Sequence, residues 1–366
     1  MATLEIDGGK LLRNVGRIEE FIPVESELIV VVKAGAYISD IKGVIEILSR
    51  TSIAKYAVAT NEEAFELNRI DSAKPILILN PEINESLFSS SEVLEPCIFS
   101  IELLELIYNY SLRLEREVTI HLNLNSGMNR MGISDYEIEM VSFLLKGNRF
   151  LKLESVFSHF SSSDDPDLDD YSSSQVVLFN SMKLKLENCL GMSIKSHIQN
   201  TNGVFRFAKL NNDFVRIGIG LYGIVDPFFL TNNLILERVH KLSAKIIFIK
   251  EMFKGDSIGY GRSFICDTKL RVAVIPIGYA DGISRRLAYQ NFKVSVCDKE
   301  VRILGKISMD LISIDISSVD NAKIGSEVVF FSESKPIEDM SRALDTIPYE
   351  VLTNIGSRVK RKLINI

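Results

Sequence analysis

Residues 28–33 read LIVVVK, an uninterrupted apolar run that ends in a lysine. Seven similar runs follow before residue 220, separated by stretches with helical periodicity. Continuous apolar runs are typical of strands buried on both faces, as in a parallel sheet covered by helices. Eight strands alternating with helices predict a (β/α)8 barrel of the TIM type, with an open doubly wound sheet as the alternative. The other seven runs are 55–59, 75–79, 96–99, 117–124, 153–158, 195–198 and 214–219.

The intervening stretches 61–69 and 175–188 carry apolar residues at helical spacing, and Asn61 is expected to cap the first of them. After about residue 235 the pattern changes. Apolar runs come close together, with partial period-two alternation and turn residues between them, which predicts an antiparallel β domain. These runs are 242–250, 270–276, 292–298, 301–304, 311–316 and 327–331.

We therefore expect a barrel domain over residues 1–235 and a mainly antiparallel β domain over residues 236–366. Residues 1–10 are the part of the first segment expected to pack with the second domain. The basic tail Arg358–Lys362 is interpreted as a solvated chain end.

Charge and composition exclude several classes of protein. Lys and Arg total 42 against 48 Asp and Glu, a net charge of −6, which lacks the positive field of a nucleic-acid-binding protein. Four cysteines without close spacing argue against a disulfide framework and a zinc site, so no metal is expected. The N-terminus does not resemble a signal peptide, and no apolar stretch approaches the roughly 18 residues of a membrane span. A cytoplasmic protein without membrane contact is the expectation.

Unusual polar residues fall near the carboxyl ends of the predicted barrel strands, where the chemistry of such barrels is located. We expect them on one rim of the barrel. Singly, each has an ordinary structural explanation, such as a lysine whose stem lies along apolar neighbours. The residues are Lys33, His121, Asn123, Arg130, His159, His197, Asn200, Thr201, Arg216, Gly218 and Gly220.

Residues 218–223, GIGLYG, match the pattern G-x-G-x-x-G. A dinucleotide fingerprint needs a helix directly after the glycines, and here IVDPFFL follows with a proline. We therefore reject an NAD site. Exposed backbone N–H groups after the last barrel strands are instead suited to a phosphate. A strand-end lysine facing such a loop suits pyridoxal 5′-phosphate, whose aldehyde forms a Schiff base with lysine.

A series of motifs occurs in one order along the chain: VVVKAGAY, NSGMNRMG, FSHF, HIQNTNG, VRIGIGLYG, IGYGRSF, IPIGYADG, GKISMD and IPYEVL. In these motifs the chain resembles the alanine racemases, a barrel-type family dependent on pyridoxal 5′-phosphate, over nearly its whole length. The resemblance implies an isomerase that interconverts L-alanine and D-alanine by a two-base mechanism. It also implies a supply of D-alanine for peptidoglycan and a cytoplasmic homodimer with shared active sites.

The resemblance also assigns roles to individual residues. Lys33 is the Schiff-base lysine and the base on the D-alanine face, and Tyr260 of the other subunit is the base on the L-alanine face. Arg216 faces the pyridine nitrogen, and His159 lies close to the ring. The residues that contact the phosphate are Tyr37, Tyr349, Thr201 and the backbone of Gly218 and Ile219, with Asn200 in the same loop. Arg130 and the backbone of Met309 hold the substrate carboxylate. Tyr279 lines the entrance.

The chain departs from the family at Asn123, where many relatives have a carbamylated lysine. Asparagine cannot carry a carbamate, so a small anion or a water is predicted beside Arg130. A serine or broad-specificity racemase on the same scaffold remains an alternative. Barrel-type decarboxylases use an acidic partner for the pyridine nitrogen, where this chain has Arg216. Carrier proteins of the cofactor resemble the barrel alone and lack a second domain.

Overall fold

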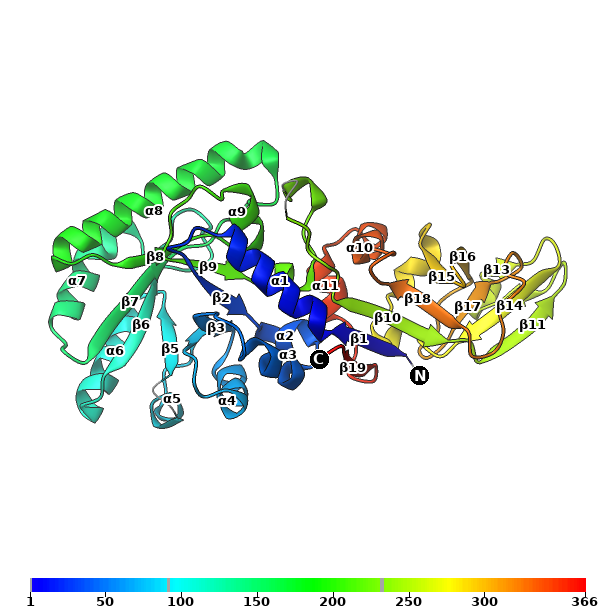
Figure 1. Ribbon diagram of the computed structural model, residues 1–366, viewed down its shortest axis with the longest axis horizontal. Coiled ribbons are helices and arrows are strands. Elements are labelled where there is room, and N and C mark those ends of the chain that lie inside the picture. The colour runs from blue at the N-terminus through cyan, green and yellow to red at the C-terminus, as the bar shows by residue number, and fades with distance from the viewer. Residues whose placement is uncertain (1, 91–92, 231–233) are drawn as a thin grey trace.

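The computed structural model describes residues 2–90, 93–230 and 234–366. An N-terminal barrel and a C-terminal β domain lie end to end, and both chain termini lie near the junction between them (Figure 1). Among the described residues, no helix has the length and apolar character needed to cross a membrane.

In the part of the chain that the structure describes, the first domain is built on eight parallel strands, each paired with its neighbour along the sheet. Strand β2 pairs with β3 and also with the last strand, β9, so the sheet curls back on itself. Two backbone hydrogen bonds close the gap between β8 and β9. Asp213 N, just before β9, donates to Ser196 O of β8 at 3.0 Å, and Arg216 N of β9 donates to Gln199 O, just after β8, at 3.1 Å. The predicted barrel is confirmed. Its strands are β2 (Glu27–Val31), β3 (Lys55–Val58), β4 (Ile76–Ile78), β5 (Leu94–Ile98), β6 (Val118–Asn123), β7 (Leu151–Phe157), β8 (Lys195–His197) and β9 (Phe214–Ile217).

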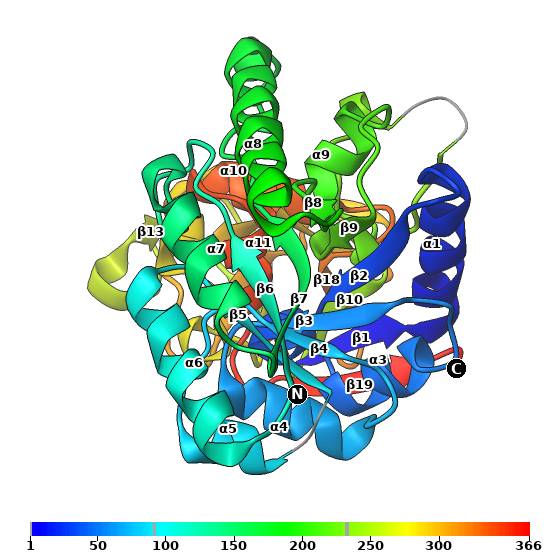
Figure 2. The same cartoon turned by 90° about the vertical axis from the view of Figure 1, so that its left-hand side faces the viewer.

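Helices form the outer layer of the barrel, as the view from its free end shows (Figure 2). The predicted cap of the helix at 61–70 was wrong by one residue. Thr60 is the cap, accepting a hydrogen bond from Glu63 N, while Asn61 donates to Glu82 O at 2.7 Å. The helices of this part are α1 (Gly8–Phe21), α2 (Lys33–Ile38), α3 (Ile41–Leu48), α4 (Asn61–Ile70), α5 (Glu85–Ser90), α6 (Ile101–Leu114), α7 (Ile138–Lys146), α8 (Asp169–Leu190) and α9 (Thr201–Arg206).

The second domain is a mainly antiparallel sheet, in the order β11-β14-β17-β16-β15-β18-β10-β1-β19, with a separate hairpin β12-β13. The predicted run 242–250 is two strands, His240–Lys245 and Phe248–Met252, which pair with different neighbours in the sheet. The elements are β1 (Thr3–Asp7), β10 (His240–Lys245), β11 (Phe248–Met252), β12 (Ser257–Ile258), β13 (Phe264–Ile265), β14 (Leu270–Ile275), β15 (Lys293–Val296), β16 (Lys299–Leu304), β17 (Ile312–Asp315), β18 (Glu327–Phe331), β19 (Lys360–Ile364), α10 (Ile337–Leu344) and α11 (Pro348–Thr353). Short 3-10 helices are η1 (Asp135–Glu137), η2 (Pro166–Leu168), η3 (Ile219–Tyr222), η4 (Pro227–Phe229), η5 (Tyr260–Arg262), η6 (Tyr279–Asp281) and η7 (Arg285–Tyr289).

The two ends of the chain meet inside this second sheet. Strand β1 pairs antiparallel with β10 and parallel with β19, so the first strand lies between elements from the far end of the chain. The interpretation of the basic tail as a solvated chain end was wrong, because residues 360–364 form β19. There the Arg361 guanidinium donates to the backbone oxygens of Ile355 and Val359. The alternating burial of Leu4 and Ile6 in β1 is the pattern of a half-buried strand.

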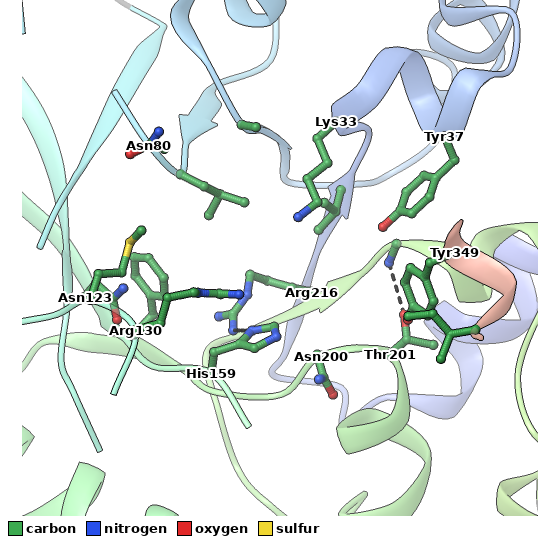
Figure 3. Close-up of a pocket in the computed structure, with 17 residues that line it drawn as sticks. Lys33, Tyr37, Asn80, Asn123, Arg130, His159, Asn200, Thr201, Arg216 and Tyr349 are labelled. Atoms are coloured by element: carbon green, nitrogen blue, oxygen red, sulfur yellow. Dashed lines mark hydrogen bonds between the residues drawn. The ribbon is translucent and has the colours of Figure 1, made fainter. Parts of the chain in front are cut away.

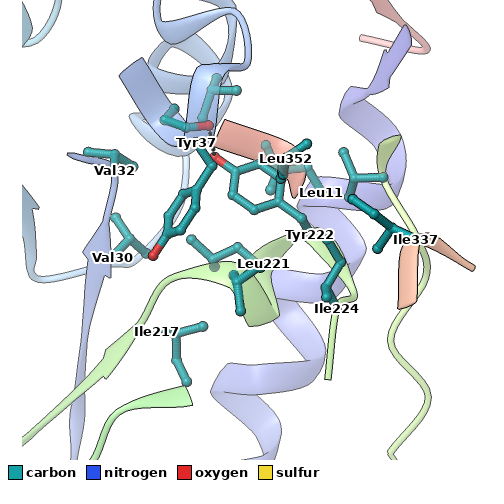
Figure 4. Packing of buried hydrophobic residues seen from close by; sticks show 14 of the residues in the cluster. Leu11, Val30, Val32, Tyr37, Ile217, Leu221, Tyr222, Ile224, Ile337 and Leu352 are labelled. Atoms are coloured by element: carbon teal, nitrogen blue, oxygen red, sulfur yellow. Dashed lines mark hydrogen bonds between the residues drawn. The ribbon is translucent and has the colours of Figure 1, made fainter. Parts of the chain in front are cut away.

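A packed cluster joins the barrel to the second domain (Figure 4). The rings of Tyr37 and Tyr222 meet edge to face at 5.6 Å between centroids. The Tyr222 hydroxyl donates to Ala36 O at 2.9 Å, and Leu352 of α11 is fully buried in the same cluster. This packing fixes the short segment that follows β2 and carries Lys33.

Candidate active site

A cavity of about 530 Å³ opens at the carboxyl ends of the barrel strands, a size typical of small-ligand sites (Figure 3). Its walls come from β2, α2, β6, β7, α9 and β9, with α11 of the second domain on one side. Most of the residues predicted from the sequence meet here. They are Lys33, Tyr37, Asn123, Arg130, His159, Asn200, Thr201, Arg216, Gly218 and Tyr349.

Lys33 stands where β2 ends, and its amine points into the cavity. The residues after it form a left-handed turn, with φ between 52° and 59° from Ala34 to Tyr37. Each non-glycine residue in this conformation costs roughly 1–2 kcal/mol. Hydrogen bonds hold the turn, from Ala34 N to Glu63 Oε1 at 2.6 Å and from Tyr222 to Ala36. The turn brings the side chains of Lys33 and Tyr37 to the same cavity.

Because of the left-handed turn, we expect glycine and alanine to differ in their effect on the free energy of unfolding at Ala34 and Gly35. A Cβ added at Gly35 meets no atom within 4 Å, so only the backbone conformation opposes it. We expect Gly35→Ala to lower the free energy of unfolding by about 1 kcal/mol. Ala34→Gly should leave it unchanged or raise it by up to about 1 kcal/mol, since relief of strain outweighs added chain entropy. Urea denaturation of both variants gives the comparison; a stable Gly35→Ala with a destabilised Ala34→Gly would contradict it.

The surroundings of Lys33 favour its neutral amine. Partial burial and the positive charge of Arg130 lower the pKa of Lys33, and the Glu63 carboxylate opposes them. A lower pKa increases the unprotonated fraction at neutral pH, and an amine must be unprotonated to attack a carbonyl carbon.

One end of the cavity has the features of an anion cradle. Gly218 N donates to Thr201 Oγ1 at 3.2 Å, and a Cβ on Gly218 would lie 2.0 Å from the Tyr37 hydroxyl oxygen. A side chain at 218 is therefore excluded, which leaves the backbone open to a ligand. Burial raises the pKa of Tyr349 to about 12 and that of Tyr37 above its ordinary value. Both phenols are neutral near pH 7 and can donate to an anion.

Two further residues were predicted at this end, and of these Asn200 lines the cavity while Ile219 does not. Asn200 caps α9, its Oδ1 accepting from Gly203 N at 2.9 Å and from the Ser163 hydroxyl at 2.7 Å. Ile219 is buried and its side chain lines a neighbouring cavity that shares Tyr349.

Arg216 lies at the other end of the cavity and is only 4% exposed. Its guanidinium donates to Ser158 O at 2.6 Å and to His159 Nδ1 at 3.3 Å. Burial lowers the pKa of Arg216 to about 9, which leaves it charged at neutral pH. Burial and the charges of Arg216, Arg130 and Lys33 lower the pKa of His159 to about 3, so its imidazole is neutral.

The charge of the cavity limits what it can bind. Its lining includes Lys33, Arg130 and Arg216, and none of the described residues that line it is acidic. Three basic side chains without a carboxylate among the described lining residues suit a ligand with several negative charges. Pyridoxal 5′-phosphate fits this arrangement, with an amine for its aldehyde, phenols and open backbone for its phosphate, and Arg216 for its ring. The small anion predicted beside Arg130, where the chain has Asn123, remains a prediction.

Three predicted residues do not reach this cavity in one chain. Tyr260, Tyr279 and Met309 lie in the second domain with exposed fractions of 68%, 42% and 51%. Tyr279 and Met309 are near each other, because Ala280 N donates to Met309 O at 3.0 Å.

The expectation that His121 and His197 lie on the barrel rim was wrong. Both are 0% exposed, inside the barrel. His121 precedes the last two residues of β6 and His197 is the last residue of β8, and both contact the buried Ser155 hydroxyl inside the barrel. Sequence reasoning missed Asn80, which lines the cavity directly after β4. The strand-end rule identifies it, because ILILN ends in a polar residue as LIVVVK does.

Family models match nearly all of the chain. Residues 6–226 match the N-terminal domain of alanine racemase, and residues 239–363 match its C-terminal domain. Alanine racemase of Clostridium tetani is 34% identical, with 98% of this chain and 94% of the relative covered. Alanine racemase 2 of Caldanaerobacter subterraneus subsp. tengcongensis is 33% identical, with 98% and 93% covered. A structure of alanine racemase from Bacillus anthracis with bound L-Ala-P has a TM-score of 0.89 and 31% identity, covering 99% of this chain and 95% of that one.

Proposed function

The chain belongs to the alanine racemase family, and we propose that its own Lys33 and the Tyr260 of a second copy carry out the reaction of that family. It is an isomerase dependent on pyridoxal 5′-phosphate that interconverts L-alanine and D-alanine. The observation that carries the assignment of residues is the placement of Lys33 in an acid-free cavity opposite Arg216.

The residues that would hold the cofactor are those of the cavity. Tyr37, Tyr349, Thr201 and the backbone at Gly218 would hold its phosphate, and Lys33 its aldehyde carbon. When bound, the cofactor supplies a carbonyl for the substrate amine and a ring that accepts electrons as the Cα proton leaves.

Arg216 would meet the ring nitrogen as a hydrogen-bond donor. An arginine effectively never gives up its proton in proteins, so Arg216 does not act as an acid there. A barrel-type decarboxylase would need a carboxylate at this place, and none of the described lining residues is acidic. The cavity therefore favours racemisation over decarboxylation.

Racemisation needs one base on each face of the substrate, because a proton is removed from one side and returned on the other. Lys33 would hold the proton on one face. The exposed Tyr260 lies outside the cavity of its own chain, which supports its delivery to a second copy in a homodimer. Arg130 would bind the substrate carboxylate, with Met309 of the second copy beside it and Tyr279 at the entrance.

An assay that couples D-amino-acid formation to an oxidase tests the substrate. We expect turnover of L-alanine to exceed that of L-serine and L-lysine. Comparable rates on all three would support the serine or broad-specificity alternative, which the names of the relatives do not favour. We further infer that the D-alanine is used for peptidoglycan and that the protein acts in the cytoplasm.

The influence of Arg130 on Lys33 gives a pH-dependent prediction. Removing the positive charge in Arg130→Gln will raise the pKa of Lys33, so capture of the cofactor by the apoprotein should require a higher pH. The measurement is the rate of capture against pH, followed by absorbance. Arg149→Gln, the same charge change ahead of β7 at the opposite end of the barrel, is the matched control. An unmoved profile in Arg130→Gln would refute the coupling.

A further inference from the structure

A chain of polar side chains crosses the interior of the barrel from the start of β3 to the cavity. Each member has an exposed fraction of 6% or less. Apolar side chains dominate the interior of such barrels, and a buried charge is costly unless it is paired and hydrogen-bonded. The presence of a continuous chain of polar side chains in this interior therefore needs a physical explanation. Its members, in order, are Lys55, Glu95, His121, Ser155, His197 and Arg216.

The end remote from the cavity is an ion pair. Lys55 Nζ donates to both carboxylate oxygens of Glu95, at 2.9 and 2.7 Å. His121 Nε2 lies 2.8 Å from Glu95 Oε2. Burial alone would raise the pKa of Glu95, but the hydrogen bonds from His121 and Lys55 and the charge of Lys55 lower it. Glu95 is therefore a carboxylate and accepts from both neighbours.

The end at the cavity fixes the direction of the first two hydrogen bonds, and the remaining bonds can follow the same direction. Arg216 can only donate, so the Nδ1 of His197 that it contacts must accept, and the proton of that ring sits on Nε2. His197 Nε2 therefore donates to Ser155 Oγ at 3.0 Å. The Ser155 hydroxyl lies 2.6 Å from His121 Nδ1 and can donate to that nitrogen. His121 then carries its proton on Nε2 and donates to Glu95. All bonds run from Arg216 to Glu95 without conflict.

We propose that Glu95 is a positioning residue for Arg216, acting through His121, Ser155 and His197. The Glu95 carboxylate can only accept, so it favours a proton on His121 Nε2 and leaves His121 Nδ1 to accept from the Ser155 hydroxyl. The Ser155 oxygen then accepts from His197 Nε2, and His197 Nδ1 is left to accept from Arg216. The inference rests on the proposed function, which places Arg216 against the ring of the cofactor.

Loss of the carboxylate removes the preference for a proton on His121 Nε2. His121 can then carry its proton on Nδ1 and donate to Ser155, whose hydroxyl turns to donate to His197 Nε2. The proton of His197 then sits on Nδ1 and opposes the donors of Arg216, which must shift. A buried ion pair contributes little net stability compared with apolar packing. Orientation of Arg216 is a role that apolar packing cannot supply.

The direct test is nitrogen NMR of the holoenzyme labelled with 15N-histidine, which has only four histidines to assign. We expect His121 and His197 to be neutral with the proton on Nε2 in the wild type. In Glu95→Gln, we expect the Nδ1-protonated form of His197 to appear, together with a shifted absorbance maximum of the lysine-bound cofactor. We expect kcat/KM to fall about 10–100-fold, as when outer partners of active-site histidines are lost.

Glu154→Gln is the matched control. Glu154 lies 3.7 Å from Lys55 Nζ and 3.1 Å from Lys195 Nζ, so it contacts the same lysine as Glu95 does, and its ion pairs are with these two lysines. We expect wild-type tautomers and absorbance, and a kcat/KM within about twofold, because the carboxylate lies outside the chain to Arg216.

Ser155→Ala breaks the chain in the middle without changing any charge, and so provides the test if Glu95→Gln does not fold. It should give the same change in absorbance, and the double variant should lose no more kcat/KM than the worse single variant. Wild-type tautomers and absorbance in Glu95→Gln or Ser155→Ala, with only thermal stability reduced, would overturn the proposal. Additive losses of kcat/KM in the double variant would also overturn the proposal. If the proposed function itself fails, the wild type lacks the absorbance of a lysine-bound cofactor, whereas the histidine tautomers still report on the chain.

Discussion

Lys33→Ala will not form a covalent link to pyridoxal 5′-phosphate, and its racemase activity will fall by at least about 10⁴-fold. The large effect follows because Lys33 has two tasks, the attachment of the cofactor and proton transfer at Cα, and positioned proton transfer alone contributes roughly 10²–10⁴-fold. The measurement combines the coupled assay with borohydride reduction and peptide mass analysis. In the wild type, the reduced cofactor should be found on Lys33.

Lys42→Ala is the control for this experiment. Lys42 lies nearby in the chain, on α3, with a side chain 73% exposed to solvent. We expect it to bind cofactor and racemise alanine as the wild type does. Full-yield fixation of the cofactor on another lysine in Lys33→Ala would refute both the assignment of Lys33 and the mechanism built on it.

Tyr260→Phe will lower racemisation by about 10³-fold or more while leaving attachment of the cofactor intact, since only the hydroxyl on one face of the substrate is lost. Tyr289→Phe, at a similarly exposed tyrosine of the second domain, is the control and should be neutral.

A mixture of the two inactive proteins tests which chain supplies the phenol. If Tyr260 acts in the other subunit, Lys33→Ala and Tyr260→Phe chains refolded together form heterodimers with one complete site, and about a quarter of wild-type activity returns. If Tyr260 acts within its own chain, no mixture has a complete site, and activity stays absent.

The sequence was informative wherever local pattern and local structure coincide. The runs 28–33 and 55–59 are short strands buried on both faces, and their apolar continuity is the direct consequence of that burial. Lys33 and Arg216 were identified as polar residues near the carboxyl ends of predicted strands, because parallel strands have their carboxyl ends on the same side of the barrel.

Other features depend on contacts that no local pattern records. The alternation in residues 3–7 indicates a strand at most, and its pairing with residues 360–364 is set by the path of the whole chain. His121 looks like a rim residue in sequence, but its place one layer deeper depends on the stagger of neighbouring strands, including a register shift beside it. Its partner Glu95 precedes a proline in an apolar run and gives no sign of its charge pair with Lys55.

The placement of β1 between β10 and β19 has a consequence for biosynthesis. Strand β1 is made long before its neighbours β10 and β19, so it is one of the last strands to find its partners. At typical translation rates of about 5–20 residues per second, the nascent strand waits on the order of 20–70 s with an unpaired edge. Barrel closure can precede that moment, but the second sheet is complete only after residues 360–364 have been made and have paired with β1.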